Sequence, residues 1–490
     1  MKAFWAITFL TIRNALRSHI FQLLLGVLLV AVIAIPTTIN GNGTAHGYIQ
    51  ISLKYSLSSI AVLLSLSAVW LGCFSMTQDV EGYQLHQVVT KPVHRAVIWL
   101  AKWSGVALVH VVLLLAAATA IYFTILWQYN LQDFSPEEKA RISQEVLVGR
   151  RVFWPDYTDE IKHDIQANVR ALQSMKLDQR LSSVDAVQDV ANKELIQDSK
   201  QLIDNLQKLN QTQGIPYTGW REWTYSGLPA DYDGNVYIKY RAYVNDAASS
   251  DDQRATNGEW TYYLVQREYA KSANAGEADK LEGYELIAEP QGFEKIPGGI
   301  FVERVMPAAS YVSPDGTVRL RFQNLDNHWS PGDDVEHATL TFQLDDGPRL
   351  MIAVASFSAN YARAVLVLIL QILIFTGLGC AAASFLSLPT AIFVVISYLL
   401  FGSFASYMLK DAYLSGIGDN IGYWVSWLLM KIVIPMQNFD VTGQVANGEL
   451  VEFSAIGKLF LEYFVLRGLP FFLLGFFCYW KRELGLVIRK

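Results

Sequence analysis

Long apolar stretches lie toward both ends of the chain, and the middle of the chain is polar. A helix that crosses the hydrocarbon of a bilayer needs about 20 apolar residues. Between the apolar stretches, residues 131–350 carry frequent Asp, Glu, Lys and Arg, as soluble proteins do. The pattern therefore predicts an α-helical polytopic membrane domain of six spans, split by a soluble insertion. The expected spans run over 20–38, 56–77, 98–127, 360–384, 389–408 and 457–480.

A short amphipathic stretch precedes the first expected span. Between Phe4 and Arg17, apolar residues recur at helical spacing, with Arg13 and Arg17 on the other side of the helix. A helix with one apolar and one basic face lies in the membrane interface rather than across the bilayer. We therefore expect residues 1–130 to hold an interfacial helix followed by spans one to three.

The insertion divides into two parts with different periods. Over 131–215 the apolar residues recur at helical spacing, which predicts an extracytoplasmic helical region, a stalk or a hairpin. Over 216–357 the period is two, and Asp-Gly turns such as Asp315-Gly316 separate the alternating runs. Short alternating strands with such turns are typical of an antiparallel β-sandwich. Residues 358–490 then hold spans four to six.

Positive charges predict the orientation, because short cytoplasmic loops are enriched in Lys and Arg. With six spans, three basic groups fall on one side, so both termini and the loop between spans two and three are expected in the cytoplasm. The insertion at 131–357 is then extracytoplasmic. The apolar segment 421–436 is interpreted as re-entrant or interfacial, because another span would move the basic C-terminus outside. The three groups are Lys2, Arg13 and Arg17; Lys91, Arg95 and Lys102; and Lys481, Arg482, Arg489 and Lys490.

Composition narrows the class of protein. Hydrophobic residues make up 52% and charged residues 17% of the 490 residues, whereas soluble domains average about 25% charged residues. The net charge of −6 and the lack of a long basic run argue against nucleic acid as a partner. Cys73, Cys380 and Cys478 all lie in apolar segments, so neither a disulfide framework nor a thiolate metal site is expected.

The sequence lacks the motifs that carry common catalytic chemistry. It has no Gly-x-x-x-x-Gly-Lys-Ser/Thr loop for nucleotide phosphates, no His-Glu-x-x-His and no Gly-x-Ser-x-Gly. Its eight histidines do not cluster at metal-ligand spacing. We therefore expect no catalytic residue, no metal site and no bound cofactor in this chain.

Three ionisable residues fall inside expected spans, where charge is costly and often functional. His110 lies in the middle of span three, Arg363 begins span four, and Arg467 lies in span six. A neutral His110 bonded to a neighbouring helix is the alternative to a functional one. The arginines could meet an anionic substrate or lipid headgroup. Alternatively they extend to the interface or pair with a carboxylate such as Glu462.

The segment between spans two and three has a distinctive order of charges. Asp79 and Glu81 precede Thr90–Arg95, which contains a Lys-Pro pair, and Lys102 follows in the next helix. From the residues alone, a solvated basic loop explains this order as well as a contact site does. The order also resembles the first coupling segment of ABC-2 type transporter permeases, in particular the multi-copper-enzyme-maturation and gliding-motility subgroup.

Further segments are similar to this family. The N-terminal interfacial helix resembles its elbow helix, and the tight turn Ser384–Pro389 resembles its second cytoplasmic contact. The external segment Ile434–Asp440, ahead of the last span, is also similar. The resemblance covers both membrane halves, about half of the chain. The large insertion departs from the usual small-loop permease and leaves the substrate class open.

The resemblance implies a permease subunit of an ABC transporter in the bacterial inner membrane. It implies pairing with a second permease subunit, the same or a related chain, and with a cytoplasmic dimer of ABC ATPases that binds ATP and Mg. ATP hydrolysis there would drive export, or mechanical work in the periplasm, through a coupling helix. The chain itself would not be an enzyme. The implied contacts to the ATPases are Asp79, Glu81, Gln84, Lys91, Pro92 and Arg95.

Two other functions stay open at this point. One is a membrane-anchored receptor or scaffold whose β-sandwich binds an envelope protein or a glycan without transport. Aromatic residues such as Trp220 and Tyr263 support it, although we expect most aromatics in the core. The other is an enzyme in the insertion, which hydrolysis of an envelope polymer by a 131–356 fragment would reveal. Copurification of an ATPase separates the permease from the receptor.

Overall fold

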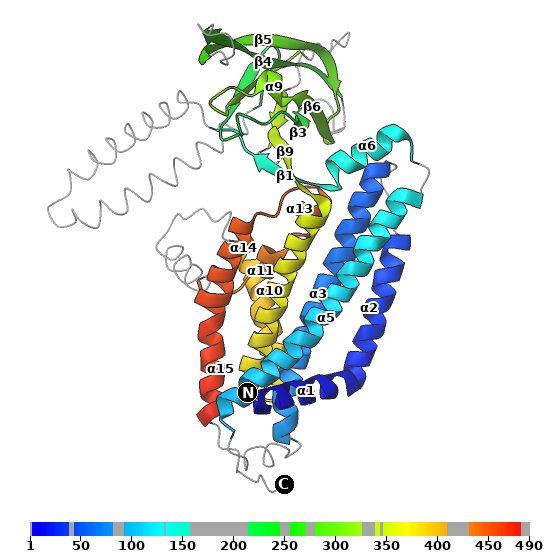
Figure 1. The fold of residues 1–490 in the computed structure, drawn as a ribbon, viewed down its shortest axis with the longest axis vertical. Helices are drawn as coiled ribbons and strands as arrows, with labels where there is room; N and C mark the ends of the chain where they lie inside the picture. Colours follow the sequence, from blue (N-terminus) through cyan, green and yellow to red (C-terminus); the bar gives the residue numbers. More distant parts are fainter. Residues whose placement is uncertain are drawn as a thin grey trace, which may run out of the picture. The chain divides into compact units, whose positions relative to one another are not determined.

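Helices form toward both ends of the chain, and β-strands form between them (Figure 1). One unit, Met1–Gly149 with Val354–Lys490, is helical, and a second, Arg150–Ala353, is built mainly of β-strands. The expected stalk at 157–213 and the segment 421–430 lie outside the described residues. The computed structural model describes residues 2–38, 44–81, 93–131, 134–156, 214–245, 255–270, 280–325, 339–343, 346–408 and 431–481.

Four helical runs are long and apolar enough to cross a membrane. Each overlaps one of the expected spans. The last run consists of three segments, and the middle one, η2, is a π-helix. The runs are α3 (Ala45–Glu81), α5 (Arg95–Leu131), α10 (Phe357–Ala383), and α14 (Phe453–Leu459) with η2 (Phe460–Gly468) and α15 (Leu469–Lys481).

The other two expected spans are helical, but neither helix by itself is both long and apolar enough to cross a membrane by the same measure. α2 (His19–Thr38) meets this measure only together with α1 (Lys2–Arg17), from which it is bent by 69°. The apolar part of α11 (Leu388–Met408) is shorter. The structure thus confirms a helical membrane part beside a β unit, and it does not confirm six spans. The remaining helical segments of this unit are α6 (Pro136–Glu145), η1 (Met436–Phe439) and α13 (Thr442–Ala446).

α1 lies crosswise to the long helices (Figure 1). Thr8, Thr11 and Ala15 form its buried side, while Trp5 and Phe9 are exposed. An amphipathic helix at the membrane surface places its large apolar side chains among the lipids. The geometry agrees with the interfacial helix expected from the sequence.

Two glycines let α3 and α10 pack backbone against backbone. A Cβ atom on Gly72 would lie 2.8 Å from the Thr376 carbonyl oxygen, and one on Gly379 would lie 2.7 Å from the Val69 carbonyl oxygen. The Cys73 thiol donates to the Gly379 carbonyl oxygen at 3.4 Å. Small residues allow such close approach, and close packing drives helix association in lipid. We call this contact the α3–α10 seam.

The β unit contains two antiparallel sheets. The first has the order β1-β9-β3-β6, with β8 also paired to β3, and the second has the order β2-β7-β4-β5. A short helix, α9 (Ala308–Tyr311), follows β6. The strands are β1 (Val148–Phe153), β2 (Trp220–Tyr225), β3 (Asn235–Asn245), β4 (Thr256–Ala270), β5 (Lys280–Ile296), β6 (Phe301–Pro307), β7 (Val318–Asn324), β8 (Thr339–Phe342) and β9 (Arg349–Ser356).

An aromatic cluster fills the core of the β unit. Trp260 is 1% exposed. Its ring lies 5.0 Å from that of Tyr240 and 5.1 Å from that of Phe322, centroid to centroid. Trp223 and Phe342 pack against the same ring. These five aromatic residues therefore serve the core, which is the role that the sequence predicts for most aromatic residues of the insertion.

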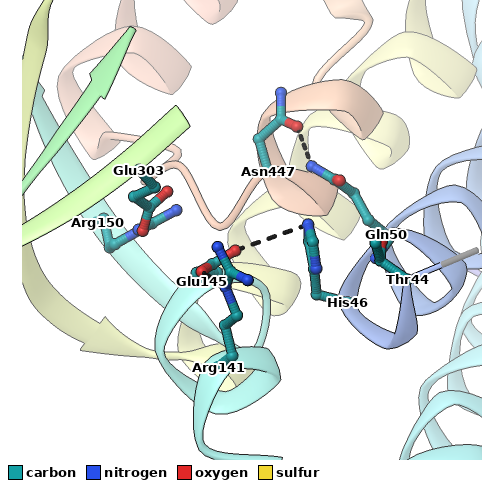
Figure 2. A network of polar contacts seen from close by, with 9 residues as sticks. Thr44, His46, Gln50, Arg141, Glu145, Arg150, Glu303 and Asn447 are labelled. Carbon is teal, nitrogen blue, oxygen red and sulfur yellow. Dashed lines mark hydrogen bonds and ion pairs between the residues drawn. The ribbon is translucent and has the colours of Figure 1, made fainter. Parts of the chain in front are cut away.

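Strand β1, at Val148–Phe153, lies within the range 131–215 that is expected to be helical, whereas α6 in the same range is a helix. Arg150 in this strand is fully buried, pairs with Glu303, and lies 5.2 Å above the Tyr237 ring. Figure 2 shows Arg150 and Glu303 side by side. Sequence patterns identify a strand by alternating apolar and polar residues. A buried arginine reverses that alternation, so the strand escapes detection.

The seam predicts an unusual effect of alanine. Alanine normally favours a helix over glycine by about 1 kcal/mol, but at Gly72 or Gly379 the added Cβ would push the helices apart. We expect G72A and G379A to lower the melting temperature of the purified chain in detergent. Gly26 in α2 has nothing within 4 Å of its Cβ position, so G26A should leave that temperature unchanged or raise it. Equal melting temperatures in the three variants would contradict the seam.

Candidate functional site

The start of α5 contacts four other elements at one end of the helical unit. These are α1, the end of α3, the turn between α10 and α11, and the end of α15. Figure 1 shows the beginning of α1 and the end of α15 at this end. We call the set of contacts the α5 junction. Its residues on α5 are Arg95, Trp99, Ala101, Lys102 and Gly105.

Trp99 joins α5 to the turn after α10. Its indole Nε1 donates to the Ser384 hydroxyl at 3.0 Å, and that hydroxyl donates to the Cys380 carbonyl oxygen at 2.8 Å. Trp99 is 3% exposed and Ser384 is fully buried. A buried polar group costs free energy when it lacks a partner. The two bonds therefore hold the turn at Ser384–Pro389, which resembles the second cytoplasmic contact of the ABC-2 permeases.

Lys102 joins α5 to the end of α3. Its side chain is almost completely buried, and its ammonium donates to the Ser75 carbonyl oxygen. A buried ammonium needs acceptors, because lipid and packed side chains do not solvate it. The position of α5 is thus tied to the last two turns of α3.

α1 and α15 complete the junction. The Thr8 hydroxyl lies 3.3 Å from the Ala101 carbonyl oxygen, and a Cβ atom on Gly105 would lie 3.0 Å from the Thr8 carbonyl oxygen. Arg95 donates to the Trp480 carbonyl oxygen near the end of α15. α1 therefore rests directly on α5, and the first residue of α5 reaches the last turn of α15.

The residues implied to contact an ATPase lie next to this junction or outside the described residues. Asp79 and Glu81 belong to the last turn of α3, and only their backbone is described. Arg95 begins α5 and takes part in the junction. The described residues therefore include the two ends of the segment from Asp79 to Arg95, and residues 82–92 lie outside them. The residues outside the described part are Gln84, Lys91 and Pro92.

His110 is fully buried between α5 and α3. Its Nδ1 lies 2.9 Å from the Val106 carbonyl oxygen, and its Nε2 lies 2.9 Å from the Ser67 hydroxyl oxygen. A neutral ring with Nδ1 protonated donates to the carbonyl and accepts from the hydroxyl. Both ring nitrogens are then satisfied. The geometry favours the helix-to-helix role over a ligand-binding one.

Both arginines of the expected spans have partners within the protein. The Arg363 guanidinium lies 3.5 Å from the Val451 carbonyl oxygen and 4.4 Å above the Phe453 ring. Arg467 forms an ion pair with Glu462 in η2. The pairing of Arg467 is the alternative that the sequence suggested for it.

A second polar network lies at the other end of the long helices (Figure 2). His46 Nε2 is 3.9 Å from Glu145 Oε2, and Arg141 Nε donates to Glu145 Oε1 at 2.6 Å. Gln50 donates to the Asn447 side chain. The bonds tie α3 to α6 and to the segment after α13. No group of three His, Cys, Asp or Glu in the described part of the chain is placed to hold a metal ion.

Sequence reasoning missed several buried amides inside the helices. Asn360 donates to the Glu449 carbonyl oxygen and accepts from the Val451 amide, both at 2.8 Å. Gln128 donates to the Pro36 carbonyl oxygen at 2.9 Å. The feature of the sequence that could have indicated these bonds is an uncharged amide within an otherwise apolar run. Uncharged polar residues raise less suspicion than charged ones, although they need partners for the same reason.

Comparison with protein-family models, with curated proteins and with solved structures finds no match for this chain. The function must therefore be argued from the geometry and from the segments that resemble the ABC-2 permeases. The α5 junction is the part of the described structure best placed to transmit a displacement, and it offers no catalytic arrangement of its own.

The bond between Trp99 and Ser384 predicts a measurable coupling. Replacing Trp99 by Phe, or Ser384 by Ala, removes the hydrogen bond between them, which contributes about 1 kcal/mol. Ser384→Ala also removes the bond to the Cys380 carbonyl oxygen, a loss that the cycle subtracts. In a double-mutant cycle, the combined variant should be less destabilised than the sum of the two single variants by about that amount. Unfolding in mixed micelles measures it. W5F, at an exposed tryptophan of α1, controls for loss of an indole, and strict additivity would show that the bond is absent.

Proposed function

We propose that this chain is a membrane permease subunit of an ABC transporter. It couples ATP hydrolysis by separate cytoplasmic ATPase subunits to export or to mechanical work outside the membrane. In this proposal α2 and α11 are also spans, which makes six, and both termini lie in the cytoplasm of a bacterium. A second permease subunit, the same or a related chain, completes the transporter.

The α5 junction is the observation that supports the proposal most directly. The segment that resembles the ATPase-coupling segment ends at Arg95, and within three turns α5 contacts α1, α3, α15 and the turn at Ser384. A push on this segment therefore reaches four elements together. A partner shifts a conformational equilibrium when its contacts differ between the two states, and in this proposal the ATPase makes such contacts to the segment that ends at Arg95.

The α3–α10 seam extends the path of such a displacement. α3 carries Asp79 and Glu81 at its end and packs on α10 through glycines. α10 begins at Phe357, directly after β9 ends at Ser356, without a connecting loop. α10 is therefore continuous in sequence with a strand of the first sheet. This continuity suits mechanical work outside the membrane.

A receptor or scaffold without transport receives less support. Trp220 is exposed on the second sheet, but the Arg321 guanidinium lies 4.1 Å above its ring. On the same strands, Glu222 accepts from the Tyr263 hydroxyl at 2.9 Å and lies 3.3 Å from Arg319. These groups interact with one another, which leaves fewer of them for a sugar ring.

Charge reversal at the coupling segment tests the proposal. We expect an ATPase to copurify with the native chain in mild detergent. The amount of ATPase that copurifies should fall at least about tenfold in the variant with Glu81→Arg and Arg95→Glu, because two favourable charge contacts with the ATPase become repulsive. The variant with Glu137→Arg and Lys139→Glu, on α6, is the matched control and should retain the ATPase. A native chain that brings down no ATPase despite intact folding would sink the permease proposal.

The six-span arrangement makes a separate prediction about sidedness. Single cysteines are introduced in a background without the three native cysteines and labelled in intact cells with a membrane-impermeant maleimide. Thr44→Cys and Asp440→Cys should react, whereas Lys2→Cys and Ser387→Cys should react only after permeabilisation. Equal labelling at positions 2 and 44 would remove α2 as a span, and equal labelling at 387 and 440 would remove α11.

A further inference from the structure

A cavity of about 220 Å³ lies within the helical unit. It is bounded by α3, α10, α11 and the segment from η1 to α13. An engineered apolar cavity of about 150 Å³ is large enough to bind benzene. The cavity therefore has room for a small organic molecule. Its polar lining residues are Ser58, Gln371, Ser403, Gln437, Asp440 and Thr442.

Gln371 on α10 and Thr442 are the most deeply buried polar residues of the described lining. Thr442 already bonds to Asp440. The Gln371 side chain is 3% exposed. Within the described residues, neither the Gln371 amide nor the Ser58 hydroxyl on α3 has a hydrogen-bond partner, although both line the cavity. An amide buried among apolar helices costs free energy when it is left unbonded. A molecule in the cavity would therefore lie beside two polar side chains that are able to bond to it.

Asp440 is the one charged residue among the described residues of the lining. Its Oδ1 accepts from the Thr442 hydroxyl at 2.6 Å and from the Thr442 amide at 3.1 Å, and its side chain is exposed. Among the described residues that line the cavity, none is Lys, Arg or His. Anionic groups such as phosphate are therefore disfavoured, and a cation is favoured. Apolar side chains such as Leu368 and Phe439 form other parts of the wall.

We propose that this cavity binds a small organic ammonium ion with an apolar body and a hydrogen-bonding group at its other end. The ammonium lies at Asp440, the apolar body contacts Leu368 and Phe439, and the hydrogen-bonding group reaches Gln371 and Ser58. A hydroxyl suits Gln371 well, because it both donates and accepts, as an amide does. The inference does not rest on the proposed coupling to an ATPase.

Three matched probes test the chemistry of the cavity by calorimetric titration of the full chain in an uncharged sugar-based detergent. Tyramine has an ammonium, a phenyl ring and a hydroxyl. Phenethylamine lacks the hydroxyl, and 4-hydroxyphenylacetate replaces the cation with an anion. We expect tyramine to bind, phenethylamine to bind about tenfold more weakly, and 4-hydroxyphenylacetate not to bind. Equal binding of all three, or no binding of tyramine, would overturn the proposal in favour of a cavity occupied by lipid or water.

Variants then assign the two ends of the molecule. Asp440→Asn keeps an oxygen for Thr442 and should weaken tyramine binding by at least about tenfold. Gln371→Leu should abolish the preference for tyramine over phenethylamine while the melting temperature holds or rises, because a buried unbonded amide is removed. Glu137→Gln on α6 removes an exposed carboxylate away from the cavity and should bind tyramine as the native chain does. Unchanged affinity in D440N would refute the cation site.

Discussion

Close packing of α10 is the constraint on which the helical unit depends. Lipid offers no hydrophobic drive for helices to associate, so they associate where small residues let backbones meet. In an apolar stretch of 18 residues of α10, 83% is buried inside the protein, whereas the corresponding share in the last helical run is 22%. α10 meets α3 at Gly379 and meets α15 where Gly475 faces Ala381. It is thus a central helix, and other helices are placed by their contact with it.

Several polar residues inside the helical unit form hydrogen bonds to a neighbouring element. His110 bonds to Ser67, and Trp99 bonds to Ser384. Each bond crosses between elements that lie far apart in the sequence or belong to different spans. An unsatisfied group in such surroundings is costly, which makes Gln371 informative. Gln371 lines the cavity, and the proposed ligand would supply the partner that this amide lacks within the described residues.

The long apolar runs and the alternating strands were predictable because each depends on local pattern. α3, α5 and α10 follow from apolar length, and β7 buries every second side chain as its alternation predicts. The turn at Asp315-Gly316 followed from a glycine that adopts a positive φ of 75°. The α3–α10 seam could not be predicted, because glycines that face another helix look like any other glycines. β1 was missed because its buried Arg150 requires a partner, Glu303, that lies more than a hundred residues away.

The π-helix η2 gives the last helical run a property that an ordinary α-helix lacks. A π-helix has wider turns than an α-helix, with hydrogen bonds one residue longer, so Glu462 and Arg467, five residues apart, are able to pair. Shifting this segment by one residue toward α geometry would turn everything after it by about 100° around the helix axis. That turn would carry Gly475 away from Ala381 and pull the ion pair apart. The π-helix η2 therefore sets the rotational phase of α15 relative to α10, and the pair between Glu462 and Arg467 accompanies it.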